Sequence, residues 1–341
     1  MIEQKIQSLG TDLKSVGLTD KDDRYRGRRV LVTGADGFMG SFLVERLLAV
    51  GAIVSALVRP CSVNGTVGYR LRNLNRVAGE IDEILAVDVA GSEAVERIVE
   101  WSPQVVFHLA ADAYVERSFR YPREVMRTNL GGTQQVLTAA TRYGAIERVV
   151  ITSSSEIYGG TRYDRINEDH PLEPTSPYAA SKVAADRLAY AYHRTYGTPV
   201  AIIRPFNTFG PRHVYDVIPK FIERALRGEP LVVYGDGSQK RDFTYVDDMV
   251  EAFLYMGSHP DAVGRAVNFG SGTAISIAEL ASLVVAAANS VSTIVTGAAR
   301  AAEVACLCCD PSLAERLFGW CARVNLAEGL RRHVRWARDR L

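Results

Sequence analysis

The sequence of 341 residues contains no apolar run long enough to cross a membrane, so we expect no membrane partner. It also has little net charge, because 40 basic residues are balanced by 39 acidic ones and the formal charge is +1. A nearly neutral chain has no general field that attracts nucleic acid, so we expect no such partner. Residues 1–27 are polar and lack the apolar core of a signal peptide, which leads us to expect a cytoplasmic protein with an N-terminal extension.

Cysteine is scarce and odd in number, with five residues in the chain. Cys306 and Cys309 have the CxxC spacing of some zinc sites, but no second pair or neighbouring histidine completes a ligand set. The segment 304–308 has instead the pattern of a buried strand, in which cysteine acts as a small apolar residue. We therefore predict no metal site and reduced thiols, which fit a cytoplasmic location.

Apolar runs of strand length alternate with amphipathic segments from residue 28 to about residue 204. This alternation is typical of an α/β protein with a parallel, doubly wound, Rossmann-like sheet. We predict a nucleotide-binding domain over 28–204 and a smaller α/β substrate-binding region over 205–341, with interleaved segments. Helices are expected near 122–143, 177–196, 217–228, 247–257, 276–289 and 326–339, and a short strand at 231–234.

A glycine-rich turn follows the first predicted strand, 28–33. Gly34, Gly37 and Gly40 suit a tight turn, a close approach of backbone to a pyrophosphate, and tight packing of helix on strand. Phe38 and Met39 begin the helix that comes next, and its free N–H groups and positive dipole end would face the phosphates. The turn therefore predicts a dinucleotide cofactor.

The ends of the next strands predict how the rest of that cofactor lies. Arg59 follows the strand 53–58, where an arginine pairs with the 2′-phosphate of NADP or stacks on the adenine of NAD, and both cofactors stay open. Asp88, with Val89 beside it, is placed to accept a hydrogen bond from the adenine amino group. A further strand ends in small or apolar residues that would let the cofactor lie against it, namely Leu109, Ala110 and Ala111.

Tyr178 and Lys182 are four residues apart and so share one face of the predicted helix 177–196. A nearby ammonium favours phenolate, so we expect Lys182 to lower the tyrosine pKa from its usual value of about 10. The phenolate can remove the proton of an alcohol while hydride passes to a nicotinamide.

Together with the turn TGADGFMG, the stretches HLAA, TNLGGT, TSSSEIYG, PYAASK, RPFNTFGPR and GDGSQKRDFTYVDD carry a resemblance. The chain resembles, over about residues 28 to 320, the extended short-chain dehydrogenase/reductases that act on nucleotide sugars, most closely those of the GDP-mannose 4,6-dehydratase type. The resemblance implies a nucleotide-diphosphate sugar as substrate, NAD or NADP as a tightly bound and recycled cofactor, and a homodimer built on the two helices 122–143 and 177–196.

The resemblance also implies roles for single residues. Tyr178 and Lys182 would be the catalytic pair, with Lys182 also on the nicotinamide ribose, and Asn129 would be a structural residue close to the cofactor. Asn207 and Arg241 would contact the diphosphate, a role that suits a guanidinium fork. Arg212 and His213 follow Asn207 and could contact a phosphate, or a sugar carboxylate if the substrate were a uronic acid.

Glu156 decides which reaction the resemblance implies. Sugar 4,6-dehydratases have a carboxylate at this place, which removes the C5 proton after C4 has been oxidised, while Ser154 would assist Tyr178 at the C4 oxygen. Ser155 stands where an aspartic acid would protonate the leaving C6 hydroxyl, and a serine is far less acidic, so the general acid stays open. UDP-glucuronate decarboxylases share the Ser-Glu pair, and 4-epimerases share the oxidation by tyrosine. A non-catalytic cofactor-binding protein is the remaining alternative.

Overall fold

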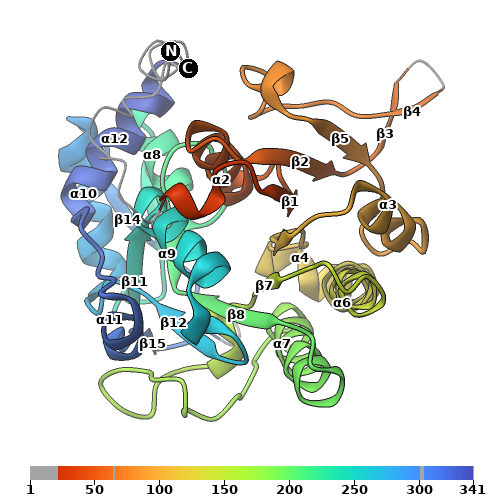
Figure 1. Ribbon diagram of the computed structural model, residues 1–341. Helices are drawn as coiled ribbons and strands as arrows, with labels where there is room; N and C mark the ends of the chain where they lie inside the picture. Colours follow the sequence, from red (N-terminus) through yellow and green to blue (C-terminus); the bar gives the residue numbers. More distant parts are fainter. Residues whose placement is uncertain (1–21, 64–65, 300–302, 341) are drawn as a thin grey trace.

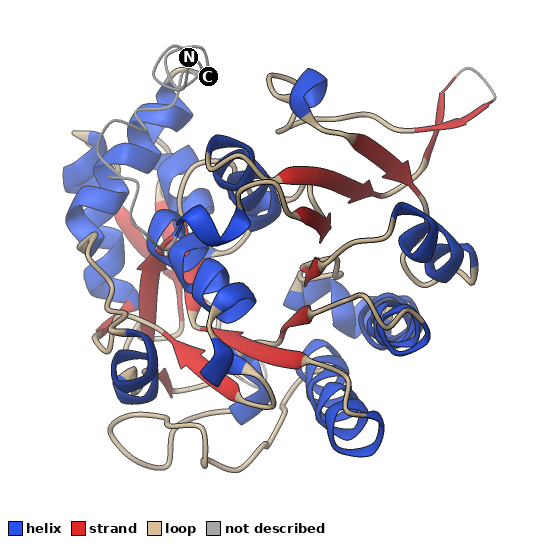
Figure 2. Ribbon diagram, in the orientation of Figure 1, coloured by secondary structure: helices blue, strands red, loops and turns tan. Residues whose placement is uncertain are grey.

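The computed structural model describes residues 22–63, 66–299 and 303–340, and its centre is a sheet of seven parallel strands in the order β12-β8-β7-β6-β1-β2-β5 (Figures 1 and 2). Several of these strands, such as β7, are buried along their whole length because helices cover both faces. The predicted Rossmann-like architecture is confirmed. The strands are β1 (Arg29–Thr33), β2 (Ile53–Val58), β5 (Glu83–Ala86), β6 (Val105–His108), β7 (Arg148–Thr152), β8 (Val200–Pro205) and β12 (Ala266–Phe269).

Two groups of helices enclose the sheet (Figure 1). On one face α2 (Phe38–Ala49) and α9 (Val246–Ser258) pack against the strands in one large apolar cluster. On the other face α3 (Glu93–Trp101), α6 (Gly132–Arg142) and α7 (Pro177–Tyr196) form the second cluster. Because the chain runs from β1 outward to β2 and β5, and then returns to β6 on the other side of β1, the order of strands reverses between β1 and β6. Ligands of open parallel sheets bind at this reversal, at the carboxyl ends of the strands.

The helical segment predicted at 122–143 is present but interrupted. It consists of α5 (Pro122–Met126), a π-helical turn at Arg127–Gly131, and α6. Such turns occur frequently at functional sites. The helix predicted at 177–196 has the same bounds in the structure, with its first turn capped by the Ser176 hydroxyl, which accepts from the Ala179 N–H at 3.1 Å.

The smaller region contains short strands and three helices that pack together. In it β9 (Asn207–Phe209) pairs in parallel with β11 (Lys240–Tyr245), which also pairs with β13 (Ala274–Ser276) and β15 (Cys306–Leu307). The other elements are β10 (Leu231–Tyr234), β14 (Ile294–Gly297), α8 (Val217–Arg227), α10 (Ile277–Ala288) and α12 (Leu326–Arg338). Elsewhere lie β3 (Cys61–Val63), β4 (Thr66–Gly68), α4 (Val115–Arg120), α11 (Ser312–Phe318) and the 3-10 helices Asp22–Tyr25, Ala78–Glu80, Ser155–Tyr158 and Pro260–Ala262.

Segments from both ends of the chain contribute to the large sheet and its cover. The strand β12 and the helix α9 come from beyond residue 204, yet they complete that sheet and one of its faces. Tyr25, from the segment expected to be an extension, is fully buried, and its hydroxyl donates to the Leu254 carbonyl at 2.7 Å. The part of the extension over residues 1–21 lies outside the described residues.

Candidate active site

The glycine turn after β1 packs backbone directly on backbone. Gly34 has φ +67°, and a Cβ there would lie 2.8 Å from backbone atoms of Ala110 at the end of β6. A Cβ at Gly40 would lie 2.2 Å from the Gly34 carbonyl oxygen. Gly37 precedes the first residue of α2, so the N–H groups of Phe38 and Met39 are at the free helix N-terminus. This cradle fits the pyrophosphate of a dinucleotide.

A buried polar chain joins the strand ends beneath that cradle. The Thr33 hydroxyl lies 2.8 Å from His108 Nδ1 and accepts from the Ala110 N–H at 3.1 Å, and His108 Nε2 lies 3.1 Å from the Thr133 hydroxyl. Burial lowers the pKa of His108 to about 3, with the Lys182 charge acting in the same direction, so the imidazole is neutral. The partly buried residues that follow, Leu109 to Ala111, form the floor on which the sequence predicts the cofactor to lie.

The predicted adenosine ligands lie at the ends of neighbouring strands. Arg59 is exposed after β2, and Asp88 follows β5, which pairs with β2. Burial alone would raise the pKa of Asp88, but hydrogen bonds from Arg127 and the Ala90 N–H, together with the charge of Arg59, hold it below its usual value. Val89 is buried against the first residues of α6.

Asn129, in the π-helical turn, ties two parts of the site together. Its Oδ1 accepts from the Asp112 N–H at 2.7 Å, and its Nδ2 donates to the Asp112 carbonyl at 3.1 Å and the Ser181 hydroxyl at 2.8 Å. The Ser181 hydroxyl donates in turn to the Tyr178 carbonyl at 2.6 Å. Asn129 thus fixes the segment after β6 against the helix that carries the tyrosine.

Tyr178 and Lys182 are both buried on one face of α7, but they do not pair with each other. Lys182 Nζ donates to the Thr152 carbonyl at 2.6 Å, and burial lowers its pKa to about 8, opposed by Asp186 one turn further along. The Tyr178 and Ser154 hydroxyls share a hydrogen bond, which lowers the tyrosine pKa, while burial raises it by more. The expectation that Lys182 holds the pKa of Tyr178 below its usual value is therefore wrong for this structure, because burial dominates.

Glu156 lies at the carboxyl end of β7, where the chain turns into a 3-10 helix. Its N–H donates to the Ser154 hydroxyl at 3.2 Å, and its side chain lines a cavity of about 600 Å³. Burial raises the pKa of the Glu156 carboxyl, Arg241 lowers it, and the carboxylates of Asp216 and Glu303 raise it. A partly buried carboxyl with a raised pKa suits proton transfer near neutral pH. Ser155 is buried and lies outside the cavity wall.

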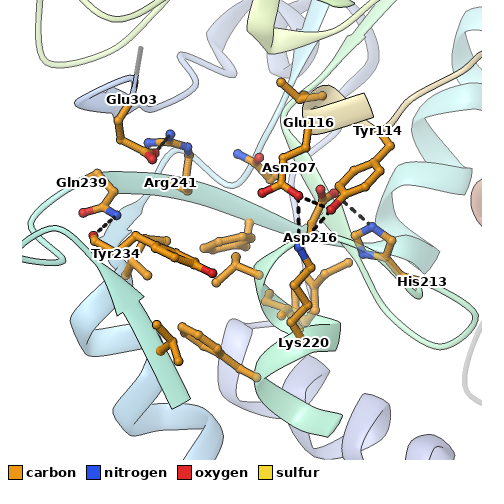
Figure 3. A pocket seen from close by; sticks show the side chains of 18 of the residues that line it. Tyr114, Glu116, Asn207, His213, Asp216, Lys220, Tyr234, Gln239, Arg241 and Glu303 are labelled. Atoms are coloured by element: carbon orange, nitrogen blue, oxygen red, sulfur yellow. Dashed lines mark hydrogen bonds and ion pairs between the residues drawn. The ribbon is translucent and has the colours of Figure 1, made fainter. Parts of the chain in front are cut away.

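Asn207 and Arg241 meet in this cavity, as Figure 3 shows. The parallel pairing of β9 with β11 sets Asn207 opposite Phe243, and Arg241 comes two residues earlier on the same face of β11. The Arg241 guanidinium donates to the Val304 carbonyl at 2.7 Å and pairs with Glu303 at 2.9 Å. Asn207 Nδ2 donates to the Asp242 carbonyl at 3.2 Å.

Arg212 is not brought to the cavity. Its guanidinium donates to the Ser41 hydroxyl at 3.0 Å and to Glu45 at 2.7 Å, and it lies 4.4 Å from the centre of the Phe42 ring. All three partners belong to α2, so Arg212 secures the loop after β9 to the helix that begins at the glycine turn. His213, its neighbour, does line the cavity.

The sequence analysis missed several residues of the cavity wall. Tyr114 and Lys220 come from separate elements and lie 3.1 Å apart, with Glu116 3.5 Å from the same lysine (Figure 3). Asp216 also lines the cavity. A signal was present in the run of charged and aromatic residues from 212 to 216, directly after the Asn207 motif.

The comparison with known families agrees with this geometry. Residues 31–333 match the family described as GDP-mannose 4,6 dehydratase. The chain belongs to this family. Its relatives include nucleotide-sugar 4,6-dehydratases and epimerases of the extended short-chain dehydrogenase/reductases, which confirms the resemblance predicted from the motifs.

Individual relatives of this dehydratase family carry different activities. The chain is 34% identical over 317 residues to the UDP-glucose 4-epimerase of Mycolicibacterium smegmatis, covering 92% of this chain and 99% of the epimerase. It is 35% identical to the dTDP-glucose 4,6-dehydratase of Streptomyces griseus, with 90% and 93% covered. The crystal structure of DesIV, a dTDP-glucose 4,6-dehydratase from Streptomyces venezuelae with NAD bound, superposes with a TM-score of 0.83 at 33% identity, covering 91% and 97%.

The sequence predicts neither a metal site nor a membrane-spanning helix. Among the residues that the structure describes, no group of three His, Cys, Asp or Glu side chains is arranged to hold a metal ion. The strand predicted around the cysteines is present as β15, and Cys308 and Cys309 are buried. Within the described ranges, no helix combines the length and the apolarity that crossing a membrane requires.

Proposed function

We propose that this member of the family is a nucleotide-sugar 4,6-dehydratase that works with NAD or NADP. The observation that carries the proposal is Glu156, whose carboxyl lines the cavity and has a raised pKa, and whose N–H donates to the Ser154 hydroxyl that is hydrogen-bonded to Tyr178. A carboxylate at the cavity and a buried phenol linked to it through Ser154 could act on adjacent carbons of one sugar. The product would be a 4-keto-6-deoxy sugar.

The first step would take place at the C4 hydroxyl. The phenolate form of Tyr178, which the hydrogen bond shared with Ser154 favours against burial, would remove the hydroxyl proton, and Ser154 would orient the same oxygen. A nicotinamide, when bound, would supply the hydride chemistry of this reaction. The turn from Gly34 to Gly40 would hold its pyrophosphate, Arg59 and Asp88 its adenosine, and Lys182 its ribose.

The second step would take place at C5. A ketone at C4 makes the C5 proton acidic, and the Glu156 carboxylate removes it as the C6 hydroxyl departs. Because burial raises the pKa of Glu156, its carboxylate is a stronger base than an exposed glutamate. Asn207 and Arg241 would hold the diphosphate so that C4 faces Tyr178 and C5 faces Glu156.

The charges around Glu156 favour a neutral hexose over a uronic acid. The carboxylates of Asp216 and Glu303 already raise the pKa of Glu156, so a further carboxylate on the sugar would be repelled there. Arg241 is paired with Glu303 at 2.9 Å, and Lys220 lies 3.5 Å from Glu116. This balance supports dehydration over decarboxylation of a glucuronate. Similarity to a 4-epimerase keeps epimerisation as the second candidate.

The test is product analysis with UDP-, dTDP- and GDP-hexoses and with UDP-glucuronate. We expect one hexose to lose a single water by mass spectrometry. Loss of carbon dioxide from the glucuronate, or a new isomer of unchanged mass, would show decarboxylation or epimerisation instead. Glu156→Gln should abolish water loss while C4 oxidation continues, so that absorbance of reduced nicotinamide accumulates in a single turnover. Glu96→Gln, on the exposed face of α3, is the matched control and should dehydrate normally.

We also propose the homodimer built on the helical segment 122–143 and on α7, with α4 beside them. Large apolar side chains are exposed on and beside these helices, namely Phe119, Tyr121, Met126, Tyr190 and Tyr196. Exposed apolar patches of this kind mark protein interfaces. A molar mass twice that of the chain, measured by light scattering, would support the proposal, and Tyr190→Glu should shift it toward the monomer.

A further inference from the structure

The proposed dehydration leaves one proton unaccounted for. The C6 hydroxyl departs as water only if an acid protonates it, and the family's usual position for that acid carries Ser155. That hydroxyl is buried, lies outside the cavity wall and is a very weak acid. The following inference rests on the proposed dehydratase function and asks which other group supplies the proton.

Asp216 has a backbone conformation that points to a role. Its φ is +70° and its ψ is −174°, a region that is reached almost only by glycine and costs other residues roughly 1 to 3 kcal/mol. It directly precedes α8, where an aspartate usually caps the helix, yet its side chain makes no capping hydrogen bond. The strained backbone and the missing cap show that the Asp216 carboxylate does not serve the helix N-terminus.

The carboxylate is directed to His213 and to the cavity. Asp216 Oδ2 lies 3.2 Å from His213 Nε2, and half of the Asp216 side chain stays exposed (50%) where it lines the cavity (Figure 3). The imidazole is fixed between two rings, stacked on Phe38 at 4.7 Å and edge-on to Tyr215 at 4.7 Å. Its buried Nδ1 has no hydrogen-bond partner among the described residues, so Nε2 is the ring nitrogen placed to exchange a proton with Asp216.

Asp216 also lines the same cavity as the proposed C5 base, Glu156. Its charge raises the pKa of Glu156 and the pKa of Tyr178. In the substrate C4, C5 and C6 are consecutive, so the group that attends C6 must lie beside those that attend C4 and C5. Asp216 lines the cavity together with Glu156, whereas Ser155 is buried and has only a very weakly acidic hydroxyl.

We propose that Asp216, sharing a proton with His213, is the general acid that protonates the departing C6 hydroxyl. As the Glu156 carboxylate takes the C5 proton, the C5–H electron pair forms the second bond between C5 and C6. The C6–O bond breaks, its electron pair stays on oxygen, and Asp216 gives the proton that completes the water molecule. The proton that Tyr178 took from the C4 hydroxyl equals the one that the Asp216–His213 pair gives. Between turnovers Tyr178 releases its proton to solvent, and the half-exposed Asp216 takes one up from solvent.

A leaving group that needs no proton isolates this step. The native protein, Asp216→Asn and Glu156→Gln are each assayed with dTDP-glucose and dTDP-6-deoxy-6-fluoroglucose, and with the UDP pair, because fluoride departs without a general acid. We expect Asp216→Asn to lower kcat for the 6-hydroxy sugar by about 10²- to 10³-fold, the usual contribution of a general acid, and to lower kcat for the 6-fluoro sugar by less than about tenfold. Glu156→Gln should stop both substrates, since both must lose the C5 proton.

Two controls complete the experiment. Asp261→Asn changes another histidine–aspartate pair, His259 with Asp261 at 3.7 Å, neither of which lines the cavity, and should leave both rates unchanged. His213→Gln should slow the 6-hydroxy sugar more than the 6-fluoro sugar. If Asp216→Asn lowered kcat equally for both sugars, the carboxylate would only position the substrate. This inference would then be overturned, while the proposed dehydratase function would stand. If the native protein eliminated neither water nor fluoride, the proposed function would fail first and this inference with it.

Discussion

Lys182 Nζ donates a hydrogen bond of 2.6 Å to the backbone carbonyl of Thr152, at the carboxyl end of β7. The Lys182 ammonium is thus hydrogen-bonded to the end of strand β7. Asp186, one helical turn away, raises the lysine pKa and so opposes the effect of burial. Asp186 itself is fixed by Arg204, whose Nε donates to it at 2.9 Å. Burial of the lysine and its partners has a consequence for stability that can be measured.

The unfolding free energy should rise with pH because of Lys182. Burial lowers its pKa from 10.5 to about 8, so between these values the folded state has lost the proton and the unfolded state still binds it. Stability increases with pH wherever the unfolded state binds more protons. Lys182→Met removes this dependence. The free energy of unfolding of the native protein should therefore rise with pH relative to that of the variant, by about 3 kcal/mol over the full interval. Urea unfolding at several pH values measures the difference.

The same measurement on Lys240→Met supplies the control for Lys182. Lys240 is exposed at the start of β11, so its difference from the native protein should stay constant over that pH interval. A constant difference for Lys182→Met as well would show that its ammonium is not desolvated in solution. Activity gives an independent readout, since only Lys182→Met should lose the oxidation at C4.

Gly34 and Gly197 have nearly the same backbone conformation but different surroundings. Their φ values are +67° and +69°, and a Cβ would clash with Ala110 backbone atoms at 2.8 Å in Gly34 but meet nothing within 4 Å in Gly197. Gly197→Ala should therefore cost about 1 kcal/mol for the left-handed conformation. Gly34→Ala should cost roughly 1 to 3 kcal/mol more, for overpacking, and should also abolish binding of NAD measured by calorimetry. Equal costs would show that the turn can move away from β6.

The sheet could be predicted from the sequence because its strands are covered on both faces. A continuous apolar run gave β2 its correct bounds, and the helix α7 was marked by Pro177 at its start and Gly197 after its end. The π-helical turn at Asn129 was not predictable, since its sequence continues the helical pattern on both sides. A buried side-chain amide that bonds three other groups fixes that turn instead.

The candidate site was predictable where local pattern determined it. Tyr178, Lys182 and Glu156 follow from helix spacing and from the end of a strand. The pairing of β9 with β11 joins residues more than thirty positions apart, such as Thr208 and Thr244, and no local pattern specifies it. Arg212 has a φ of +71°, which no local pattern predicts, and its guanidinium lies against α2 rather than in the cavity, so its contact with substrate stays a prediction.

Arg212 and Glu45 should prove strongly coupled. Their side chains are only 12% and 10% exposed and form an ion pair of 2.7 Å, so removing either partner leaves a buried charge. We expect a double-mutant cycle of Arg212→Met and Glu45→Gln to give a coupling energy of about 1 to 3 kcal/mol. The cost of Arg212→Met should shrink at acid pH, since burial raises the pKa of Glu45 and Arg212 lowers it, and protonation then removes the unpaired charge.

Kinetics separate this positioning role of Arg212 from substrate contact. Because the arginine secures the loop that carries His213 and Asp216, its loss should lower kcat and leave KM for the nucleotide sugar nearly unchanged. Arg241→Gln, at the cavity itself, should raise KM. A large rise of KM in Arg212→Met would restore the interpretation that this arginine binds the diphosphate.

The acid limb of the pH–rate profile should report Glu156. The proposed base acts as the carboxylate, so kcat falls as pH drops through its pKa, which burial raises above the usual value for glutamate. Glu303 raises this pKa further and Arg241 lowers it. Glu303→Gln should therefore move the acid limb to lower pH, and Arg241→Gln should move it to higher pH, with kcat measured at saturating sugar. Glu96→Gln should leave the limb in place. If the acid limb moved in the same direction in both variants, the titrating group would not be Glu156, because opposite charges next to one carboxyl must shift its pKa in opposite directions.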